Sequence, residues 1–144
     1  MKFNHVGVSV TDIDASIAFY RDMLGMEQLM DIIPFGGPDI EAIMDIPGVT
    51  GRMCMIGKGT LNLELFEFDR SEPRGKNYPV SDGGYTHFGV EVDDIEATYE
   101  KLKAAGVRMH SPIISFNGGT MRASYCRDPD GNVFEIMQAF APSE

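Results

Sequence analysis

Residues 5–15 read HVGVSVTDIDA and residues 87–97 read HFGVEVDDIEA, so the chain carries one stretch of sequence twice. Seven of the eleven positions are identical in the two copies. Each copy continues into a helical pattern that ends at a glycine, in LGM at 24–26 and in AGV at 105–107. A repeat of this kind predicts two equivalent structural modules joined in tandem.

The ends of the two halves also correspond. Residues 61–68 read LNLELFEF and residues 132–140 read NVFEIMQAF, which places Glu64 at the position of Glu135. The first half is longer between its helix and its last strand, and we assign the extra residues to 33–50. That segment is rich in Gly and Pro and is predicted to be a loop, acting as a lid, a specificity loop or a solvated excursion.

Each half is predicted to have the order βαβββ. Alternating, valine-rich residues predict the strands, and Asp12 and Asp94 are suited to cap the helices that follow. The expected strands lie at 3–10, 26–33, 51–57 and 60–68, and at 85–92, 107–115, 119–127 and 132–140. The fold class is therefore α+β, with module 1 at about 1–70 and module 2 at about 84–140 of a single domain, 1–144.

Composition restricts the possible partners. A chain of 144 residues with 43% hydrophobic residues is one globular domain, and its net charge of −10 disfavours binding to nucleic acid or to an anionic membrane. No apolar run is long enough to span a bilayer, and the first five residues lack the apolar region of a signal peptide. Cys54 and Cys126 match neither a disulfide framework nor a thiolate metal site. We expect a soluble, cytoplasmic protein.

Strand alternation places His5 and His87 on equivalent strand faces, each pointing away from the helix of its own half. His5 shares a strand face with Gly7, while the valines between them point to the other face and suit packing under a helix. His87 and Gly89 repeat this arrangement. If the two modules pack about a pseudo-twofold axis, His5 faces His87 and Glu64 faces Glu135.

These four side chains suit one divalent cation. Imidazoles and carboxylates bind Zn²⁺, Ni²⁺, Co²⁺, Fe²⁺ or Mn²⁺, and four such ligands leave up to two octahedral positions for water or substrate. A strand histidine is more commonly an ordinary core or surface residue, and Glu64 between two leucines also fits a solvent-facing position. The recurrence of both residue types in both halves favours the metal site. His110 has no histidine counterpart and is interpreted as a surface residue, whereas Arg122, on a predicted strand near the site, is a candidate to bind a substrate carboxylate or phosphate.

The sequence resembles the vicinal oxygen chelate superfamily, which includes glyoxalase I, methylmalonyl-CoA epimerase, extradiol dioxygenases, and fosfomycin- and bleomycin-resistance proteins. The resemblance covers nearly the whole chain, and its DPDGN turn followed by a strand with Glu is quite specific. It rests on HVGVSVTDIDASIAFYRDMLGM (5–26), LNLELFEF (61–68), HFGVEVDDIEATYEKLKAAGV (87–107) and RDPDGNVFEIM (127–137). It implies a cup-shaped mixed sheet around one metal ion, with His5, Glu64, His87 and Glu135 as ligands.

The resemblance also implies chemistry. Glu64 occupies a position that is not a ligand in extradiol dioxygenases, so the pattern is closer to glyoxalase I and the epimerases. Such an enzyme is a metal-dependent lyase or isomerase that removes a proton next to a carbonyl through a metal-stabilised enediolate. Glu135 would be the base, and Glu64 a second acid/base or only a ligand.

Two alternatives stay open, Fe(II)-dependent extradiol ring cleavage and non-catalytic binding of a small molecule by a resistance-type protein. The resemblance further implies a small carbonyl-containing substrate and a homodimer whose metal site lies within one chain or takes ligands from both subunits. Whether glutathione, CoA or neither is used is left open, because no residue cluster indicates a site for either.

Overall fold

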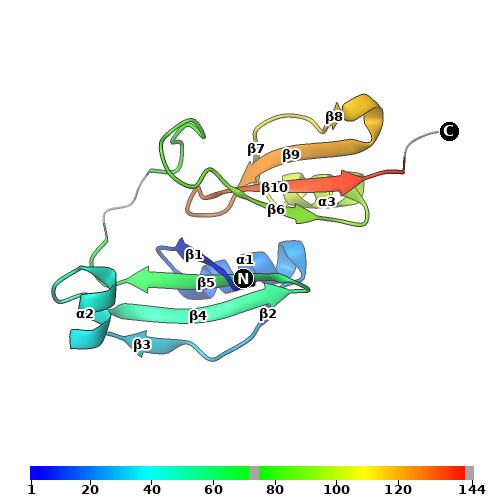
Figure 1. The fold of residues 1–144 in the computed structure, drawn as a ribbon. Coiled ribbons are helices and arrows are strands. Elements are labelled where there is room, and N and C mark those ends of the chain that lie inside the picture. The colour runs from blue at the N-terminus through cyan, green and yellow to red at the C-terminus, as the bar shows by residue number, and fades with distance from the viewer. Residues whose placement is uncertain (72–74, 142–144) are drawn as a thin grey trace. The chain divides into compact units, whose positions relative to one another are not determined.

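The computed structural model describes residues 1–71 and 75–141. The chain divides into two compact units, Met1–Arg74 and Gly75–Glu144. Each unit contains a five-stranded mixed sheet and one long helix (Figure 1). The expected α+β class with tandem, equivalent modules is confirmed.

The first unit contains seven elements in its described residues. Its sheet has the order β1-β5-β4-β2, and β3 also pairs with β4. Only β1 and β5 run parallel; the other pairs are antiparallel. The elements are β1 (Val6–Ser9), α1 (Ile13–Leu24), β2 (Glu27–Gln28), β3 (Ile33–Phe35), α2 (Pro38–Met44), β4 (Gly51–Lys58) and β5 (Leu61–Phe68).

The second unit repeats this topology. Its sheet has the order β6-β10-β9-β7, with β8 also paired to β9 and only β6 and β10 parallel. A 3₁₀ turn, η1 (Asn117–Gly119), stands where the first unit has α2. The elements are β6 (Phe88–Glu91), α3 (Ile95–Ala104), β7 (Arg108–Met109), β8 (Ile114–Phe116), β9 (Met121–Arg127) and β10 (Val133–Ala139).

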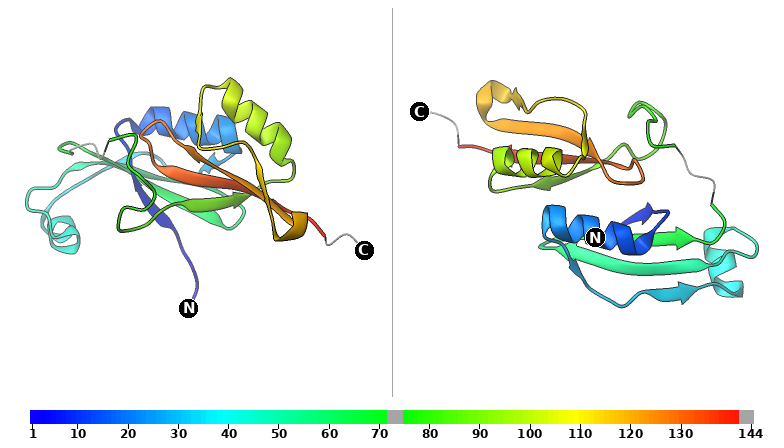
Figure 2. Two further views of the ribbon diagram at one scale, coloured as in Figure 1. Left: turned by 90° about the horizontal axis from the view of Figure 1, so that it is seen from above. Right: turned by 180° about the vertical axis from the view of Figure 1, so that it is seen from behind.

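Each long helix begins where its cap residue predicts. The Asp12 side chain accepts a hydrogen bond from the backbone N–H of Ala15, and Asp94 accepts one from Ala97, both at 2.9 Å. Gly25 ends α1 in the left-handed conformation, with φ of 67°. In Figure 2, α1 lies along one face of its own sheet and α3 along one face of the other.

The residues between helix and sheet form the core of each unit. In the first unit the predicted valine face of β1 is buried, with Val8 7% and Val10 3% exposed. The side chains that are fully buried beneath or on these helices include Ile13, Tyr20, Leu63 and Leu65, and Ile95, Leu102, Phe134 and Ile136. Cys54 and Cys126 are both buried and unbonded to each other.

Two predicted strands are each split in two. The structure replaces the strand expected at 26–33 by β2 and β3, and the strand expected at 107–115 by β7 and β8. In the second unit, Pro112 lies in the break, where it has no N–H to donate to β9. The pairing strands β4 and β9 stay continuous, so the edge bends away from the sheet and returns to it.

The loop predicted at 33–50 is wrong in part, since it contains β3 and the helix α2. Pro38 stands in the first turn of α2, where its fixed φ favours the helix and its missing N–H costs nothing. The Gly and Pro content that indicated a loop therefore marks the start of a short helix. Ile43 on α2 is 81% exposed.

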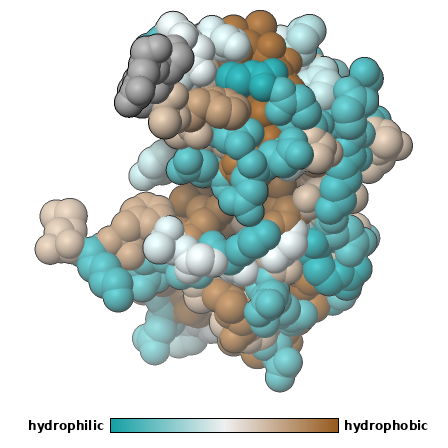
Figure 3. All heavy atoms as spheres, turned by 90° about the vertical axis from the view of Figure 1, so that its right-hand side faces the viewer, coloured by the Kyte–Doolittle hydropathy of each residue, from teal (hydrophilic) through white to brown (hydrophobic). Residues whose placement is uncertain are grey.

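Hydrophilic side chains occupy much of the face drawn in Figure 3, with hydrophobic ones between them. Among residues 1–71 and 75–141, no helix combines the length and apolar character needed to cross a bilayer.

Candidate metal centre and adjoining pocket

In the first unit the fold brings His5 beside Glu64. β1 lies parallel to β5 with Gly7 opposite Glu64, and His5 immediately precedes β1. The imidazole Nε2 of His5 lies 3.1 Å from Oε2 of Glu64. Two residues that are far apart in sequence thus form a pair because the first and last strands of the module are neighbours.

The second unit repeats the pair with His87 and Glu135. Gly89 is opposite Glu135 in the parallel pair β6–β10, and Nε2 of His87 lies 3.4 Å from Oε2 of Glu135. A Cβ atom at Gly89 would lie 3.4 Å from that same carboxylate oxygen. Glycine at this position therefore leaves room for the carboxylate to turn toward the histidine.

Each histidine is oriented by the residue before it. Nδ1 of His5 lies 2.6 Å from the side-chain oxygen of Asn4, and Nδ1 of His87 lies 2.9 Å from the hydroxyl of Thr86. The Asn4 oxygen is an acceptor, so Nδ1 of His5 is the donor in this contact, and Nε2 faces Glu64. A partner that holds the ring nitrogen opposite the ligating one is typical of histidines that bind metals.

The spacing within each pair fits shared ligation of a cation. Two ligand atoms bound at about 2.1 Å to one ion lie roughly 3.0 Å apart in octahedral and roughly 3.4 Å apart in tetrahedral geometry. The observed distances, 3.1 and 3.4 Å, match these values. Each unit by itself presents a pair, and no group of three or more His, Cys, Asp or Glu ligands occurs in the described parts of the chain. Union of the two pairs around one ion remains a prediction.

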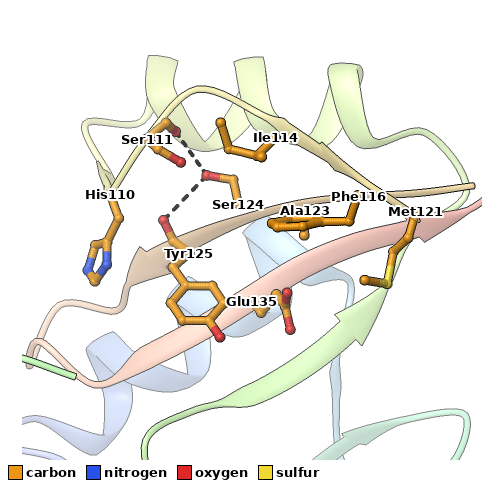
Figure 4. Close-up of a pocket in the computed structure, with 9 residues that line it drawn as sticks. All are labelled: His110, Ser111, Ile114, Phe116, Met121, Ala123, Ser124, Tyr125 and Glu135. Carbon is orange, nitrogen blue, oxygen red and sulfur yellow. Dashed lines mark hydrogen bonds between the residues drawn. The ribbon is translucent and has the colours of Figure 1, made fainter. Parts of the chain in front are cut away.

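A pocket of about 410 Å³ opens beside Glu135 in the second unit (Figure 4). The hydroxyl of Ser124 donates a hydrogen bond to the carbonyl of Ser111 at 3.0 Å, which holds the segment before β8 against β9. The residues that line the pocket are His110, Ser111, Ile114, Phe116, Met121, Ala123, Ser124, Tyr125 and Glu135. The predicted base thus lies in the wall of a cavity large enough for a small molecule.

Tyr125 adjoins both members of the second pair. It is directly opposite Glu135 in the antiparallel pair β9–β10, and its ring centroid lies 4.4 Å from that of His87. Burial, and next the negative charge of Glu135, raise the pKa of the Tyr125 hydroxyl above its ordinary value. The hydroxyl is therefore a neutral hydrogen-bond donor at physiological pH.

The structure places Arg122 elsewhere. Its guanidinium pairs with Glu96 in the first turn of α3, and Arg122 is not among the residues that line the pocket. Arg52, which is opposite Glu67 in the first unit as Arg122 is opposite Gln138 in the second, likewise pairs with Asp14 in the first turn of α1. Both arginines thus connect a sheet to its own helix.

Sequence reasoning missed Tyr125 and His110. Tyr125 was detectable, because the DPDGN turn at 128–132 fixes the register of the β9–β10 hairpin and places it opposite Glu135. His110, interpreted as a surface residue, is exposed but also lines the pocket. Its position depends on the pairing of β7 with β9, which no local pattern indicates.

Two βαβββ-type units, each with a histidine before its first strand and a glutamate on its last, define a duplicated fold with a candidate metal centre. The family model described as "Glyoxalase/Bleomycin resistance protein/Dioxygenase superfamily" matches residues 2–136. The chain belongs to this superfamily.

Similar proteins include both lyases and epimerases. The "2-epi-5-epi-valiolone epimerase" of Actinomyces sp is 31% identical over 150 residues, covering 98% of this chain and 82% of that protein. The "Probable lactoylglutathione lyase, chloroplastic" of Arabidopsis thaliana is 29% identical over 134 residues, covering 93% of this chain but only 35% of the plant protein. The chain thus spans about a third of that relative.

A solved structure shares the fold. The glyoxalase family protein APC24694 from Bacillus cereus superimposes with a TM-score of 0.87 at 17% identity, covering 98% of this chain and 95% of that one. At this identity the likeness establishes the fold alone.

Proposed function

We propose that this protein is a divalent-metal-dependent lyase or isomerase that removes a proton from a carbon next to a carbonyl group. The observation that carries the proposal is the position of Glu135, which is paired with His87 and also lines a pocket of about 410 Å³. The two relatives that are named as a lyase and an epimerase support this class of reaction.

The roles of the residues follow from their positions. His5, His87, Glu64 and Glu135 would hold the cation, because each histidine directs Nε2 toward a carboxylate. A bound divalent cation would supply Lewis-acid stabilisation of negative charge on the substrate oxygen. Glu135 accepts the proton from carbon, since its carboxylate reaches the pocket. The electron pair of the C–H bond then forms a C=C bond, and the π pair of the carbonyl moves onto its oxygen. The Tyr125 hydroxyl, which lies in the same cavity, donates a hydrogen bond to the bound substrate.

Turnover of a substrate panel tests the proposal. The full chain is loaded with Ni²⁺, Co²⁺ or Zn²⁺ and assayed with methylglyoxal–thiol adducts and 2-substituted acyl thioesters, and with Fe²⁺ and catechols in air. We expect proton-transfer activity that needs no oxygen, and a loss of roughly 10²- to 10⁴-fold in Glu135→Gln. Arg122→Gln, changed on the other face of β9, serves as the matched control and keeps its activity.

Three outcomes contradict the proposal. Cleavage of a catechol that consumes oxygen would identify the dioxygenase alternative. Tight binding of a small molecule by metal-free protein without turnover would identify the resistance-type alternative. Wild-type rates in Glu135→Gln would show that another group is the base.

We also propose that the protein is a homodimer, and mixing experiments separate two arrangements of its metal sites. If each site combines the first unit of one chain with the second unit of its partner, co-refolded His5→Ala and His87→Ala chains regain activity. In such a heterodimer one site carries both changes and the other carries none. If each site lies within one chain, the mixture stays inactive, and a monomeric mass in solution would contradict the dimer.

A further inference from the structure

His110 is held at one end of the pocket by a buried arginine. Its Nε2 accepts a hydrogen bond of 3.0 Å from Nε of Arg127, which is 5% exposed. Its backbone N–H donates to the carbonyl of Tyr125 at 2.8 Å, as Leu29 donates to Met55 in the first unit. The repeat therefore places leucine in one unit and histidine in the other, so the imidazole distinguishes this pocket from the equivalent place in the first unit.

Arg127 fixes the protonation of this imidazole. Because Nε2 is an acceptor, the ring proton is on Nδ1, and Nδ1 has no hydrogen-bond partner among residues 1–71 and 75–141. Partial burial of the ring, and next the positive charges of Arg127 and Arg108, lower the pKa of His110 below its ordinary value. At neutral pH the ring is uncharged and offers one N–H.

The arginine itself is not available to a ligand. Its other guanidinium nitrogens donate to the carbonyl of Gly131 at 2.8 Å and to that of Tyr78 at 2.5 Å, and its guanidinium lies 4.7 Å from the centre of the Tyr78 ring. None of the described residues that line the pocket is Lys or Arg. The one charged side chain among the described lining residues is the carboxylate of Glu135, so the side chains of the pocket offer an anionic ligand group no counter-charge, and the proposed cation at Glu135 would be the single positive charge beside it.

The rest of the pocket is mainly apolar. Figure 4 shows the His110 ring at one end and Met121 at the other, with the side chains of Ile114, Phe116 and Ala123 between or beside them. An aliphatic or aromatic group of a ligand removes these surfaces from water. A hydrogen-bond donor at one end of an apolar cavity fixes the orientation of a ligand that carries an oxygen.

We propose that this pocket selects an uncharged alkyl or aryl group of the substrate, and that Nδ1–H of His110 donates a hydrogen bond to an oxygen on that group. The proposal rests on the proposed function only for the place of the pocket beside the base. Binding to the pocket is measurable without turnover, so the two proposals fail separately.

Matched probes test the proposal on the full chain in the presence of a chelator, which prevents binding of a carboxylate through metal. Acetophenone and benzoate have nearly the same shape, but only benzoate is charged at pH 7.5. With methionine methyl groups labelled with ¹³C, titration is followed at the Met121 resonance. We expect acetophenone to shift this resonance with saturation, and benzoate to bind at least about tenfold more weakly. Equal or tighter binding of benzoate would overturn the proposal.

Two variants test the role of His110. His110→Phe keeps a ring but removes the N–H, and we expect acetophenone to bind about three- to tenfold more weakly. His110→Asn keeps an N–H near the position of Nδ1 and should bind within about twofold of wild type. Arg122→Gln is the control and should bind as wild type does. Unchanged affinity in His110→Phe, or equal losses in the Phe and Asn variants, would show that the histidine does not donate to the ligand.

Discussion

Glu67 and Gln138 occupy equivalent places on the last strands of the two units, and each accepts a hydrogen bond from the first residue of the helix in its own unit. Glu67 accepts from the backbone N–H of Ile13 at 2.7 Å, and Gln138 accepts from that of Ile95 at 3.0 Å. The last strand of each module thus satisfies a free N–H at the start of a helix. The two contacts differ in charge, because Glu67 is a carboxylate that also pairs with Arg52, whereas Gln138 is a neutral amide.

The substitution Glu67→Gln gives the first unit the same neutral contact that Gln138 makes with Ile95 in the second unit. Hydrogen bonds from Arg52, and next the backbone N–H of Ile13, hold the pKa of Glu67 below its ordinary value of 4.5. A lowered folded-state pKa contributes stability that is present above the unfolded-state pKa and is lost as pH falls through the folded-state pKa. We expect a lower urea midpoint for the variant at pH 7 and a difference from wild type that narrows below about pH 4. A difference that is constant from pH 7 to pH 3 would contradict this account.

Position 131 requires glycine for two reasons: its backbone is in the left-handed conformation, and there is no room for a side chain. Its φ is 87°, and a Cβ atom would lie 2.5 Å from Cα of Lys76. Gly118 has a similar φ of 67° with nothing within 4 Å of the added atom. We expect Gly118→Ala to lower the free energy of unfolding by about 1 kcal/mol and Gly131→Ala by at least about 2 kcal/mol. Urea unfolding measures both losses. Equal losses would show that the backbone at Lys76 moves aside at no cost in free energy and would contradict this prediction.

Gly89→Val tests the room left for Glu135. The added Cβ would lie 3.4 Å from Oε2 of Glu135 and 3.7 Å from Sδ of Met137, so the methyl groups beyond it crowd the carboxylate. We expect the affinity for Co²⁺, measured by competition with a chelating dye, to fall about 10- to 100-fold while the circular dichroism spectrum is unchanged. Glu91→Val, two residues along the same strand, is the control for a new valine. Wild-type affinity in Gly89→Val would place the ion away from Glu135.

Much of the fold was predictable because the two halves repeat local signals. Asp12 and Asp94 cap helices in both units, and Gly7 and Gly89 lie opposite Glu64 and Glu135 in the same register of the two parallel strand pairs. The two His–Glu pairs were predictable for the same reason. A histidine and a glutamate that recur at equivalent positions of both halves indicate a common role, which a single histidine does not. The helix α2 was missed because Pro and Gly mark both loops and the starts of helices.

The pocket was less accessible to sequence reasoning. Arg122 was assigned by its strand alone, but alternation along β9 turns it toward α3 while Ala123 and Tyr125 reach the pocket. His110 depends on a tertiary hydrogen bond from Arg127, and a search for repeated residues passes over it because the first unit has Leu29 at that place. A search for residues that both halves share therefore misses a pocket residue that only one unit carries.

The number of metal ions bound per chain tests the central claim most directly. If one His–Glu pair from each unit shares a single cation, equilibrium dialysis against Co²⁺ followed by elemental analysis gives one ion per chain. His5→Ala and His87→Ala, each folded, then bind almost none. Two ions per wild-type chain, with one retained in each variant, would mean that the pairs are separate sites, and no bound ion in the wild type would contradict the metal centre itself.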